Sequence, residues 1–341
     1  MLKEKLHHMI INNNQLYNTI KFSQNFPFKN TRRYFRNRYI NKNLRQLKPD
    51  INQKPIGQVC IETTSLCNTK CSFCPHSEMK REKKIMSDKV FRKAMIEIKS
   101  MHIKDIGMYY FGEPLTDPKL FKRIRMMKKD YPCHIQIITN GLDLDKEKSQ
   151  HIISSDADEL LISLDATDKE SYEKVRKGSF NKVVDNIKNF MKIRGYYRVN
   201  ETGYKNTPKV IVRTMVTGNN KKEVKKFTKQ WKYVVDEVQY GRIHNFCNDY
   251  IEAQQKHLIN QPCLFLWTQL IILSNGDVVP CCMDYEGKLK LGNIMNKPLR
   301  KIWNGDMIQW LRKRHLEGDY PKICKNCDVN ESLVAKWWNY D

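Results

Sequence analysis

The sequence has no apolar run long enough to cross a membrane. Such a span needs about 18 consecutive apolar residues, and the 341-residue chain contains none. Its first residues, Met1 to His8, also lack the apolar segment of a secretory signal peptide. We therefore expect a cytoplasmic protein. Eleven cysteines in such a chain indicate metal ligation in a reducing compartment rather than disulfides.

Acidic residues are also few. The chain carries 37 Asp and Glu against 61 Lys and Arg, a formal net charge of +24. This excess is typical of proteins that bind nucleic acid, anionic membranes or acidic substrates, but a general richness in Lys, Asn and Ile explains it equally well. Aromatic residues do not alternate with a basic stripe and no nucleic-acid fold signature is present, so nucleic acid is not the favoured partner.

Residues 1–55 are the most basic part, with twelve Lys or Arg and two acidic residues. Apolar side chains recur there at helical spacing, which predicts an amphipathic helix (Phe35, Tyr39, Ile40, Leu44 and Leu47). One interpretation is a helix that contacts a membrane surface or a partner. The favoured alternative is a helix packed on the rest of the protein with its charged face in water.

Three cysteines, Cys67, Cys71 and Cys74, follow the apolar run Val59–Thr64. A four-iron cluster has four metal sites, so three thiolates leave one iron open to a ligand that is not protein. A structural zinc ion instead needs four ligands, usually from paired C-x2-C units, and only His76 lies close enough to contribute. We therefore favour iron over zinc at this loop.

The C-x3-C-x2-C spacing, with an aromatic residue before the last cysteine, resembles the signature of the radical S-adenosylmethionine (radical SAM) superfamily. The resemblance implies that Cys67, Cys71 and Cys74 bind a 4Fe-4S cluster whose open iron binds SAM. One electron from the cluster then splits SAM into methionine and a 5′-deoxyadenosyl radical. The resemblance also implies that the backbone around Phe73 lies near the adenine, and that a reducing partner such as flavodoxin or ferredoxin supplies the electron.

Short apolar strands alternate with amphipathic helices from Gln58 to about Tyr240. This alternation is typical of a parallel sheet with crossover helices. Because such crossovers are right-handed, we expect a partial (β/α)6 barrel of the TIM type, with its reactive loops at the carboxyl ends of the strands. The six predicted strands are Val59–Thr64, Ile106–Phe111, Ile135–Thr139, Leu160–Leu164, Val210–Val216 and Val234–Tyr240.

The second predicted strand runs into Gly112, Glu113 and Pro114, which resemble the G-G-E-P segment of the radical SAM family. In that family the segment binds the SAM amino group through its backbone and its acid. This chain departs from the pattern because Phe111 replaces the first glycine. Taken alone, Gly-Glu-Pro indicates only a turn, and its position directly after a strand favours the binding role.

The next two strand ends continue the resemblance. Thr139 and Asn140 are similar to the family's T-N-G segment, and Ser163 and Asp165 stand where ribose contacts usually arise. Each pair alone also fits an ordinary strand-to-helix cap. Arg176 resembles an arginine that pairs with the SAM carboxylate, and a solvated charge at a helix end is the equal alternative.

Four later cysteines, Cys263, Cys281, Cys324 and Cys327, resemble the SPASM and "twitch" extensions that bind auxiliary iron–sulfur clusters. Since no cysteine follows Cys327, the resemblance implies one auxiliary 4Fe-4S cluster. Cys282 competes with Cys281, but the Gly-x4-Cys count favours Cys281. Zinc fits four cysteines as well on spacing alone. Iron is favoured here because of the first motif.

Two apolar segments, Thr268–Leu273 and Asp277–Pro280, flank an Asn-Gly turn and predict a β-hairpin that brings Cys263 and Cys281 to one end. Helices are expected over Leu299–Trp303 and Met307–Leu311. The remaining isolated cysteines are interpreted as core thiols: Cys60, Cys133 and Cys247.

We thus expect a basic extension over residues 1–55, a radical SAM core over 56–250 and a small twitch-like domain over 251–341. By resemblance, the enzyme abstracts a hydrogen atom from a small molecule or peptide and oxidises it through the auxiliary cluster, with an alcohol of a sugar or cyclitol as the favoured substrate. Arg242 is the candidate that helps a hydroxyl lose its proton.

Three alternatives remain open. The first is a maturase that modifies a peptide or protein side chain. The second is an epimerase in which a thiol such as Cys247 or Cys282 returns a hydrogen atom. The third is a zinc-binding module without enzymatic activity that binds nucleic acid. Similar ligand spacing alone does not select the substrate.

Overall fold

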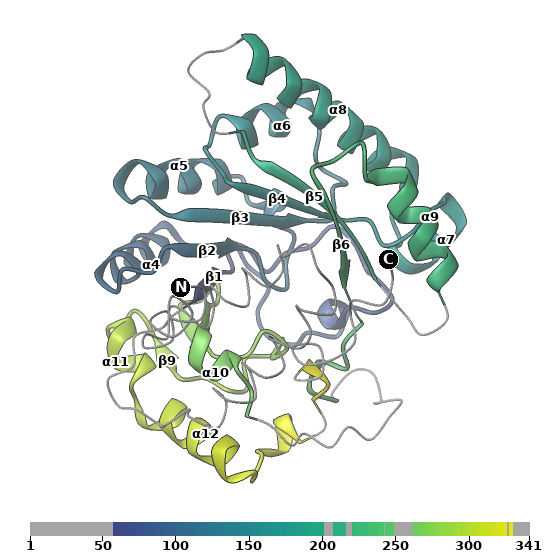
Figure 1. Ribbon diagram of the computed structural model, residues 1–341. Helices are drawn as coiled ribbons and strands as arrows, with labels where there is room; N and C mark the ends of the chain where they lie inside the picture. The colour runs from purple at the N-terminus through teal and green to yellow at the C-terminus, as the bar shows by residue number, and fades with distance from the viewer. Residues whose placement is uncertain are drawn as a thin grey trace, which may run out of the picture.

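The computed structural model describes residues 57–200, 207–215, 220–241, 243–248, 262–325 and 327–329. Six parallel strands form the central sheet in the order β6-β5-β4-β3-β2-β1, which confirms the predicted partial (β/α)6 architecture (Figure 1). The predicted basic extension, residues 1–55, and Arg242 lie outside the described residues. The six strands are β1 (Gln58–Ile61), β2 (Asp105–Met108), β3 (His134–Thr139), β4 (Glu159–Ser163), β5 (Lys209–Met215) and β6 (Glu237–Gly241).

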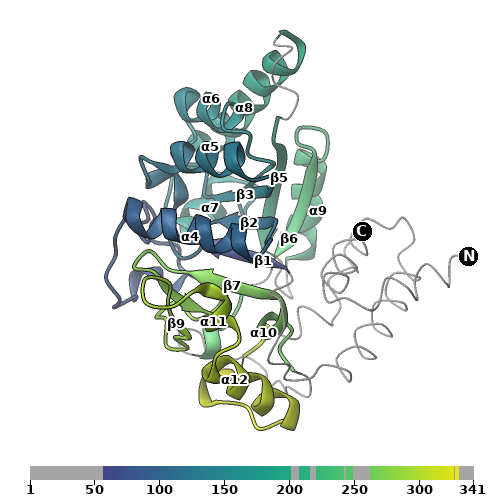
Figure 2. The same cartoon turned by 90° about the vertical axis from the view of Figure 1, so that its left-hand side faces the viewer.

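Helices connect successive strands and fan around the outside of the curved sheet (Figures 1 and 2). Side-chain caps mark several of their starts: at the start of α4, for example, the Ser87 hydroxyl accepts from the Val90 amide at 3.3 Å. The crossover helices are α4 (Asp88–Ser100), α5 (Leu120–Asp130), α6 (Lys146–Ile153), α7 (Lys169–Arg176), α8 (Phe180–Asn200) and α9 (Lys221–Trp231).

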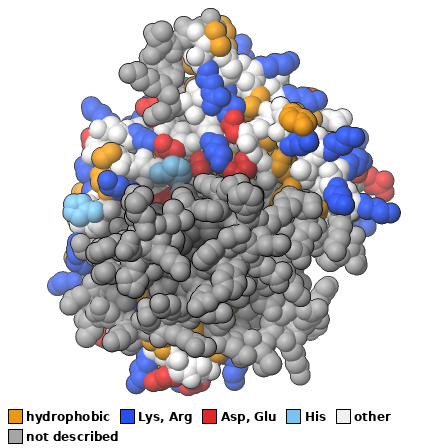
Figure 3. All heavy atoms as spheres, in the orientation of Figure 1, with side chains coloured by type: hydrophobic (Ala, Val, Ile, Leu, Met, Phe, Trp, Pro, Cys, Tyr) orange, Lys and Arg blue, Asp and Glu red, His pale blue; other side chains and the backbone are white. Residues whose placement is uncertain are grey.

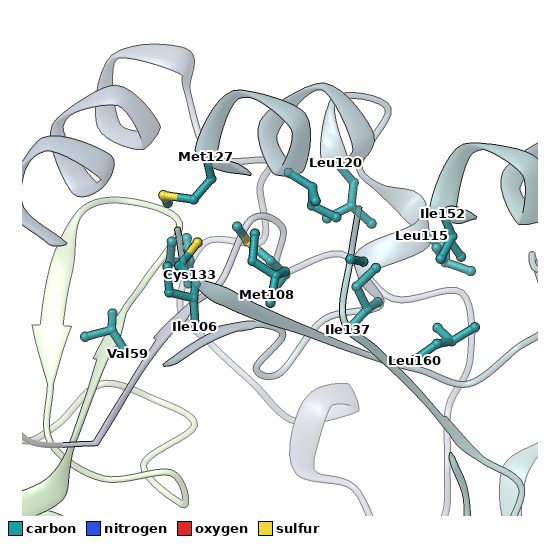
Figure 4. Close-up of a cluster of buried hydrophobic side chains, with 14 of the residues drawn as sticks. Val59, Ile106, Met108, Leu115, Leu120, Met127, Cys133, Ile137, Ile152 and Leu160 are labelled. Carbon is teal, nitrogen blue, oxygen red and sulfur yellow. The ribbon is translucent and has the colours of Figure 1, made fainter. Parts of the chain in front are cut away.

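The main core lies between the sheet and these helices. Four of the five residues of β4 are buried, as expected for a parallel strand that is covered on both faces. Figure 4 shows strand side chains facing Leu120 and Met127 of α5 and Ile152 of α6. The labelled strand side chains in that view are Val59, Ile106, Met108, Ile137 and Leu160. Cys60 and Cys133 are buried, so their prediction as core thiols is confirmed.

A C-terminal hairpin extends the same sheet. Strands β7 (Gln269–Ile272) and β8 (Asp277–Val279) are antiparallel around Gly276, whose φ of 88° suits the predicted Asn-Gly turn. The hairpin is confirmed, but β7 also pairs in parallel with β1, which the sequence did not predict. The boundary between 56–250 and 251–341 therefore stays a prediction, since one sheet crosses it.

Short elements complete the C-terminal part (Figure 2). The predicted helix over Leu299–Trp303 is present as α11, and the one expected from Met307 is longer than predicted. The remaining elements are β9 (Gly292–Asn293), α10 (Phe265–Thr268), α12 (Asp306–Glu317) and the 3-10 turns η1 (Pro75–Ser77), η2 (Pro114–Thr116), η3 (Phe246–Asn248) and η4 (Lys322–Cys324).

No helix within the described residues is long and apolar enough to span a bilayer. On the face shown in Figure 3, the described Lys and Arg side chains are scattered and interspersed with acidic and apolar ones. The high positive charge therefore does not gather into one patch on the part of this face that is described.

Candidate functional site

The first cysteine motif lies in the loop after β1, at the carboxyl edge of the sheet. The hydroxyl oxygen of Thr69 lies between two of its thiols, 3.4 Å from the Cys67 sulfur and 3.6 Å from the Cys71 sulfur. The Cys74 amide donates to the Cys71 carbonyl at 3.1 Å, which turns the chain between these two residues. The structure thus folds the motif into one compact loop.

Burial raises the pKa of the Cys67 thiol, and it raises the pKa of the Cys74 thiol to about 11. Both side chains are therefore protonated at neutral pH without metal, and a metal has to displace their protons in order to bind. Three thiols from one loop suit a four-iron cluster whose fourth iron stays open to another ligand. Among the described residues, no three His, Cys, Asp or Glu side chains are grouped to hold a single metal ion.

Gly112 lets the loop after β2 approach the cysteine loop closely. A Cβ atom at this position would lie 2.2 Å from the Thr64 carbonyl oxygen and 2.9 Å from the Leu66 carbonyl oxygen. The next amide, that of Glu113, donates to the same Leu66 carbonyl at 2.8 Å. Only glycine leaves room for this contact, so the two loops are fixed to one another by backbone atoms.

The Glu113 carboxylate is buried and joins the second strand end to the third. It accepts hydrogen bonds from the Thr139 hydroxyl at 2.6 Å, the Asn140 amide at 2.7 Å and the Leu115 amide at 3.0 Å. Burial raises the pKa of Glu113 to about 6, and the three donors oppose that rise. A carboxylate has about four acceptor positions, so one remains for a further donor. Pro114 begins η2 directly after this residue.

A second bridge joins the third strand end to the cysteine loop. The Asn140 side-chain amide donates to the Asn68 side-chain oxygen at 2.7 Å. The Asn68 side-chain amide in turn donates to the Asp143 carboxylate at 2.9 Å. Asn68 lies between two predicted cluster ligands, Cys67 and Cys71. The sequence analysis did not single it out, because no motif position marks it.

The fourth strand end places Asp165 against Arg176, the last residue of α7. Their buried side chains form an ion pair. A guanidinium nitrogen, Nη1, lies 3.6 Å from the Cys71 sulfur, and the Phe73 ring centroid lies 5.1 Å from the guanidinium carbon. The Ser163 side chain is also buried here. Arg176 is thus not a solvated helix-end charge, whereas its predicted contact with the SAM carboxylate stays a prediction.

Phe111, the departure from the family pattern, packs toward the C-terminal part of the chain. Its ring centroid lies 5.9 Å from that of Tyr285 and 5.8 Å from that of Phe246. The preceding residue, Tyr110, donates its hydroxyl to the backbone carbonyls of Cys281 at 2.9 Å and Asp284 at 2.8 Å. The loop after β2 therefore contacts both cysteine sets.

An ion pair between the buried Glu62 and the half-buried Arg81 forms a second link between the two parts. The Arg81 guanidinium donates to both carboxylate oxygens of Glu62, one of them at 2.8 Å, and its Nε donates to the Tyr285 carbonyl at 2.6 Å. The Ser274 amide of the hairpin turn also donates to Glu62 at 3.1 Å. Glu62 directly follows β1, so this pair joins the base of the cysteine loop to the C-terminal hairpin.

The four later cysteines lie close together. Cys263, Cys281 and Cys324 pack against a small apolar cluster that includes Leu266 and Leu311. Loss of solvent contact raises the pKa of the Cys263 and Cys324 thiols, and the nearby thiols of Cys281 and Cys327 raise it further. The Cys327 amide donates to the Cys324 carbonyl at 3.2 Å. These residues, predicted from spacing, thus form one group of thiols.

Cys247 is buried, as predicted, but it is not an ordinary core thiol. Its thiol lies close enough to the thiols of Cys281 and Cys327 to interact with both. Its φ of 62° lies in the left-handed region, which is uncommon for a residue other than glycine. The Asn245 amide and the His244 ring both contact Asp328, at 3.3 and 3.1 Å, and hold this turn beside Cys327. No motif spacing in the sequence indicated this position.

Cys282, the rival of Cys281, is half-buried and lies near the thiols of Cys281, Cys263 and Cys327. The thiol group therefore includes six cysteines in all: Cys247, Cys263, Cys281, Cys282, Cys324 and Cys327. Four of them follow the predicted ligand spacing, and their assignment as the ligands stays a prediction.

Comparisons with known families agree with the two cysteine sets. Residues 61–230 match the model of the radical SAM superfamily, and residues 263–328 match that of an iron–sulfur cluster-binding domain, SPASM. The chain is 24% identical to the S-adenosyl-L-methionine-dependent 2-deoxy-scyllo-inosamine dehydrogenase of Niallia circulans over 292 residues. This match covers 84% of this chain and 98% of the dehydrogenase.

Two solved structures have a similar fold. The crystal structure of BtrN in complex with AdoMet and 2-DOIA superposes with a TM-score of 0.56 at 20% identity, and covers 85% of this chain and 99% of BtrN. Streptococcus suis SuiB bound to the precursor peptide SuiA superposes with a TM-score of 0.62 at 13% identity, and covers 80% of this chain and 68% of SuiB. At these identities the likeness shows the fold alone.

The Gly112 contact generates the first prediction. Gly112→Ala should displace the cysteine loop, because the added methyl group meets two carbonyl oxygens. We expect a loss of about 1–3 kcal/mol in the free energy of unfolding and a lower iron content after anaerobic reconstitution. Gly195→Ala is the matched control, since no atom lies within 4 Å of a Cβ there. A Gly112→Ala protein with normal iron and stability would contradict the close-approach role.

Proposed function

The chain belongs to the radical SAM superfamily, and we propose that it oxidises an alcohol carbon of a sugar or cyclitol. The single observation that carries the proposal is the Tyr110 hydroxyl, which joins the end of β2 to the backbone of Cys281 and Asp284. A residue beside the first site thereby holds the second cysteine set next to it. The similarity to the inosamine dehydrogenase, which extends over 98% of that enzyme, supports the same substrate class.

The first site would hold the SAM-binding 4Fe-4S cluster through Cys67, Cys71 and Cys74. The fourth acceptor position of the Glu113 carboxylate suits the SAM amino group. Asp165 has one buried oxygen, Oδ1, that accepts no hydrogen bond from the described residues and suits a ribose hydroxyl. Further proposed contacts of SAM are with Phe73, Gly112, Pro114, Thr139, Asn140, Ser163 and Arg176.

Cys263, Cys281, Cys324 and Cys327 would hold the auxiliary 4Fe-4S cluster. When bound, SAM and the first cluster would supply a 5′-deoxyadenosyl radical, which removes a hydrogen atom from the substrate. The auxiliary cluster would supply an acceptor for the electron that the substrate loses next. The substrate thus loses a hydrogen atom, one further electron and the hydroxyl proton, which is a two-electron oxidation in total. Arg242 is proposed to help the substrate hydroxyl lose that proton.

The three alternatives to alcohol oxidation have unequal support. A non-enzymatic zinc module is set aside, because residues 61–230 match an enzyme superfamily. A peptide or protein maturase remains the second candidate, since the fold resembles that of peptide-bound SuiB. Epimerisation by a thiol is a further outcome of the tests below. A flavodoxin or ferredoxin as electron donor and a membrane contact through residues 1–55 stay proposals.

The Glu113 carboxylate generates a pH-dependent prediction. Its pKa of about 6 means that the charge attracting the SAM amino group is present above pH 6 and lost below it. Between pH 7.5 and 5.5 the SAM affinity should fall about fourfold. Glu113→Gln should weaken SAM binding by about 1.5–3 kcal/mol and remove this pH dependence. Equilibrium binding of SAM to reconstituted protein measures both effects, and unchanged affinity in the variant would contradict the assignment.

The auxiliary site generates a prediction about product. Cys281→Ala or Cys324→Ala should leave SAM cleavage intact, because these cysteines belong to the second set. Deuterium from a labelled cyclitol or sugar should still reach 5′-deoxyadenosine, while oxidised product falls at least tenfold. Mass spectrometry of both products measures the ratio, with Cys133→Ala as a control at a core thiol.

Three outcomes of this test would change the interpretation. Full product yield in the Cys281→Ala variant would mean that the second cluster only stabilises the fold, and a redox-neutral reaction would replace oxidation. Deuterium transfer from a peptide and from no cyclitol or sugar would favour the maturase. An epimer as the main product of the unmodified protein would favour the epimerase.

A further inference from the structure

We infer that Arg176 sets the reduction potential of the SAM-binding cluster by holding a buried positive charge against the sulfur of Cys71. This inference rests on the proposed function only in that Cys67, Cys71 and Cys74 hold a cluster. It concerns a different property from SAM binding, which is the role that the family resemblance implies for this arginine.

The guanidinium is fixed by several contacts around the Cys71 sulfur. Its Nη1 lies 3.6 Å from that sulfur, and its Nη2 donates to Asp165. The Phe73 ring lies over it, with the ring centroid 5.1 Å from the guanidinium carbon. Arg176 is 7% exposed, so water screens its charge little. These contacts hold the cation in one position beside a predicted cluster ligand.

The backbone holds the arginine in the same place. The Ser72 amide, in the middle of the motif, donates to the Val175 carbonyl at 2.9 Å. The C-terminal end of α7 is therefore attached to the cysteine loop itself. Asp165 meets the guanidinium from the end of β4 with a φ of 61°, an uncommon value for a residue other than glycine. The end of α7 and the end of β4 thus both fix the contact between Arg176 Nη1 and the Cys71 sulfur.

The sign of the effect follows from charge. Reduction adds one negative charge to a cluster, so a nearby cation stabilises the reduced form and raises the reduction potential. A hydrogen bond to a ligand sulfur acts in the same direction. Asp165 opposes this effect, but it binds Nη2, whereas Nη1 faces the sulfur. The positive end of the pair is therefore the end that points toward Cys71.

The test is an anaerobic redox titration of the reconstituted enzyme, without SAM or substrate, followed by electron paramagnetic resonance. The signal that changes on later addition of SAM identifies the SAM-binding cluster. Arg176→Gln should lower the ratio of reduced to oxidised cluster at a fixed potential about tenfold, which is a fall of about 59 mV in the reduction potential for one electron. Asp165→Asn should raise the reduction potential of the same cluster, because it removes the negative charge that opposes Arg176. The auxiliary cluster is the internal control and should not shift.

Arg194→Gln is the matched control variant. Arg194 is also a buried arginine paired with an aspartate, Asp236, but it belongs to α8 and contacts Pro208 and Asp236, which directly precede β5 and β6. The Arg194→Gln variant should leave the reduction potentials of both clusters unchanged. If Arg176→Gln does not retain its cluster, the double variant Asp165→Asn/Arg176→Gln removes the whole ion pair, and its potential should lie below that of Asp165→Asn alone.

Two results would overturn the inference. One is an unchanged potential in Arg176→Gln together with a tenfold weaker SAM affinity, which would assign the arginine to the SAM carboxylate. The other is an equal shift of both clusters, which would indicate a general loss of structure. A protein that oxidises no alcohol but shows the opposite shifts in the two single variants would contradict the proposed function and still support the role of Arg176.

Discussion

The close contact between the loop after β2 and the cysteine loop is the constraint on which the site depends. Gly112 brings the two backbones together, and Glu113 then ties the same loop to Thr139 and Asn140. Since a buried carboxylate needs its donors, the ends of β1, β2 and β3 are held as one unit. The thiols of the first motif are therefore positioned by neighbouring strands as well as by their own loop.

The same loop also explains how two cysteine sets belong to one enzyme. Tyr110 reaches the backbone of Cys281 and Asp284, and β7 adds to the edge of the barrel sheet beside β1. Arg81 and Glu62 form a second connection at the base of the cysteine loop. A fixed arrangement of this kind suits a reaction in which an electron leaves the substrate for a second cluster soon after the hydrogen atom is removed.

The sequence predicted the features that are local in the chain. Strand and helix periods, the Asn-Gly turn and the cysteine spacings all repeat over a few residues, and the fold follows them. It could not predict contacts between distant segments, such as that of Tyr110 with Cys281 or of Cys247 with Cys327. Phe111 is an instructive case, because it departs from the family pattern at the point where it packs on Tyr285.

Iron content tests the central claim, that this chain holds two clusters through separate cysteine sets. Anaerobically reconstituted protein should bind about eight irons per chain, since each cluster contains four. The triple variant Cys67→Ala, Cys71→Ala and Cys74→Ala should keep about half of them and lose the spectral response to SAM. A triple variant that keeps all its iron, or an unmodified protein that binds zinc in place of iron, would contradict the account.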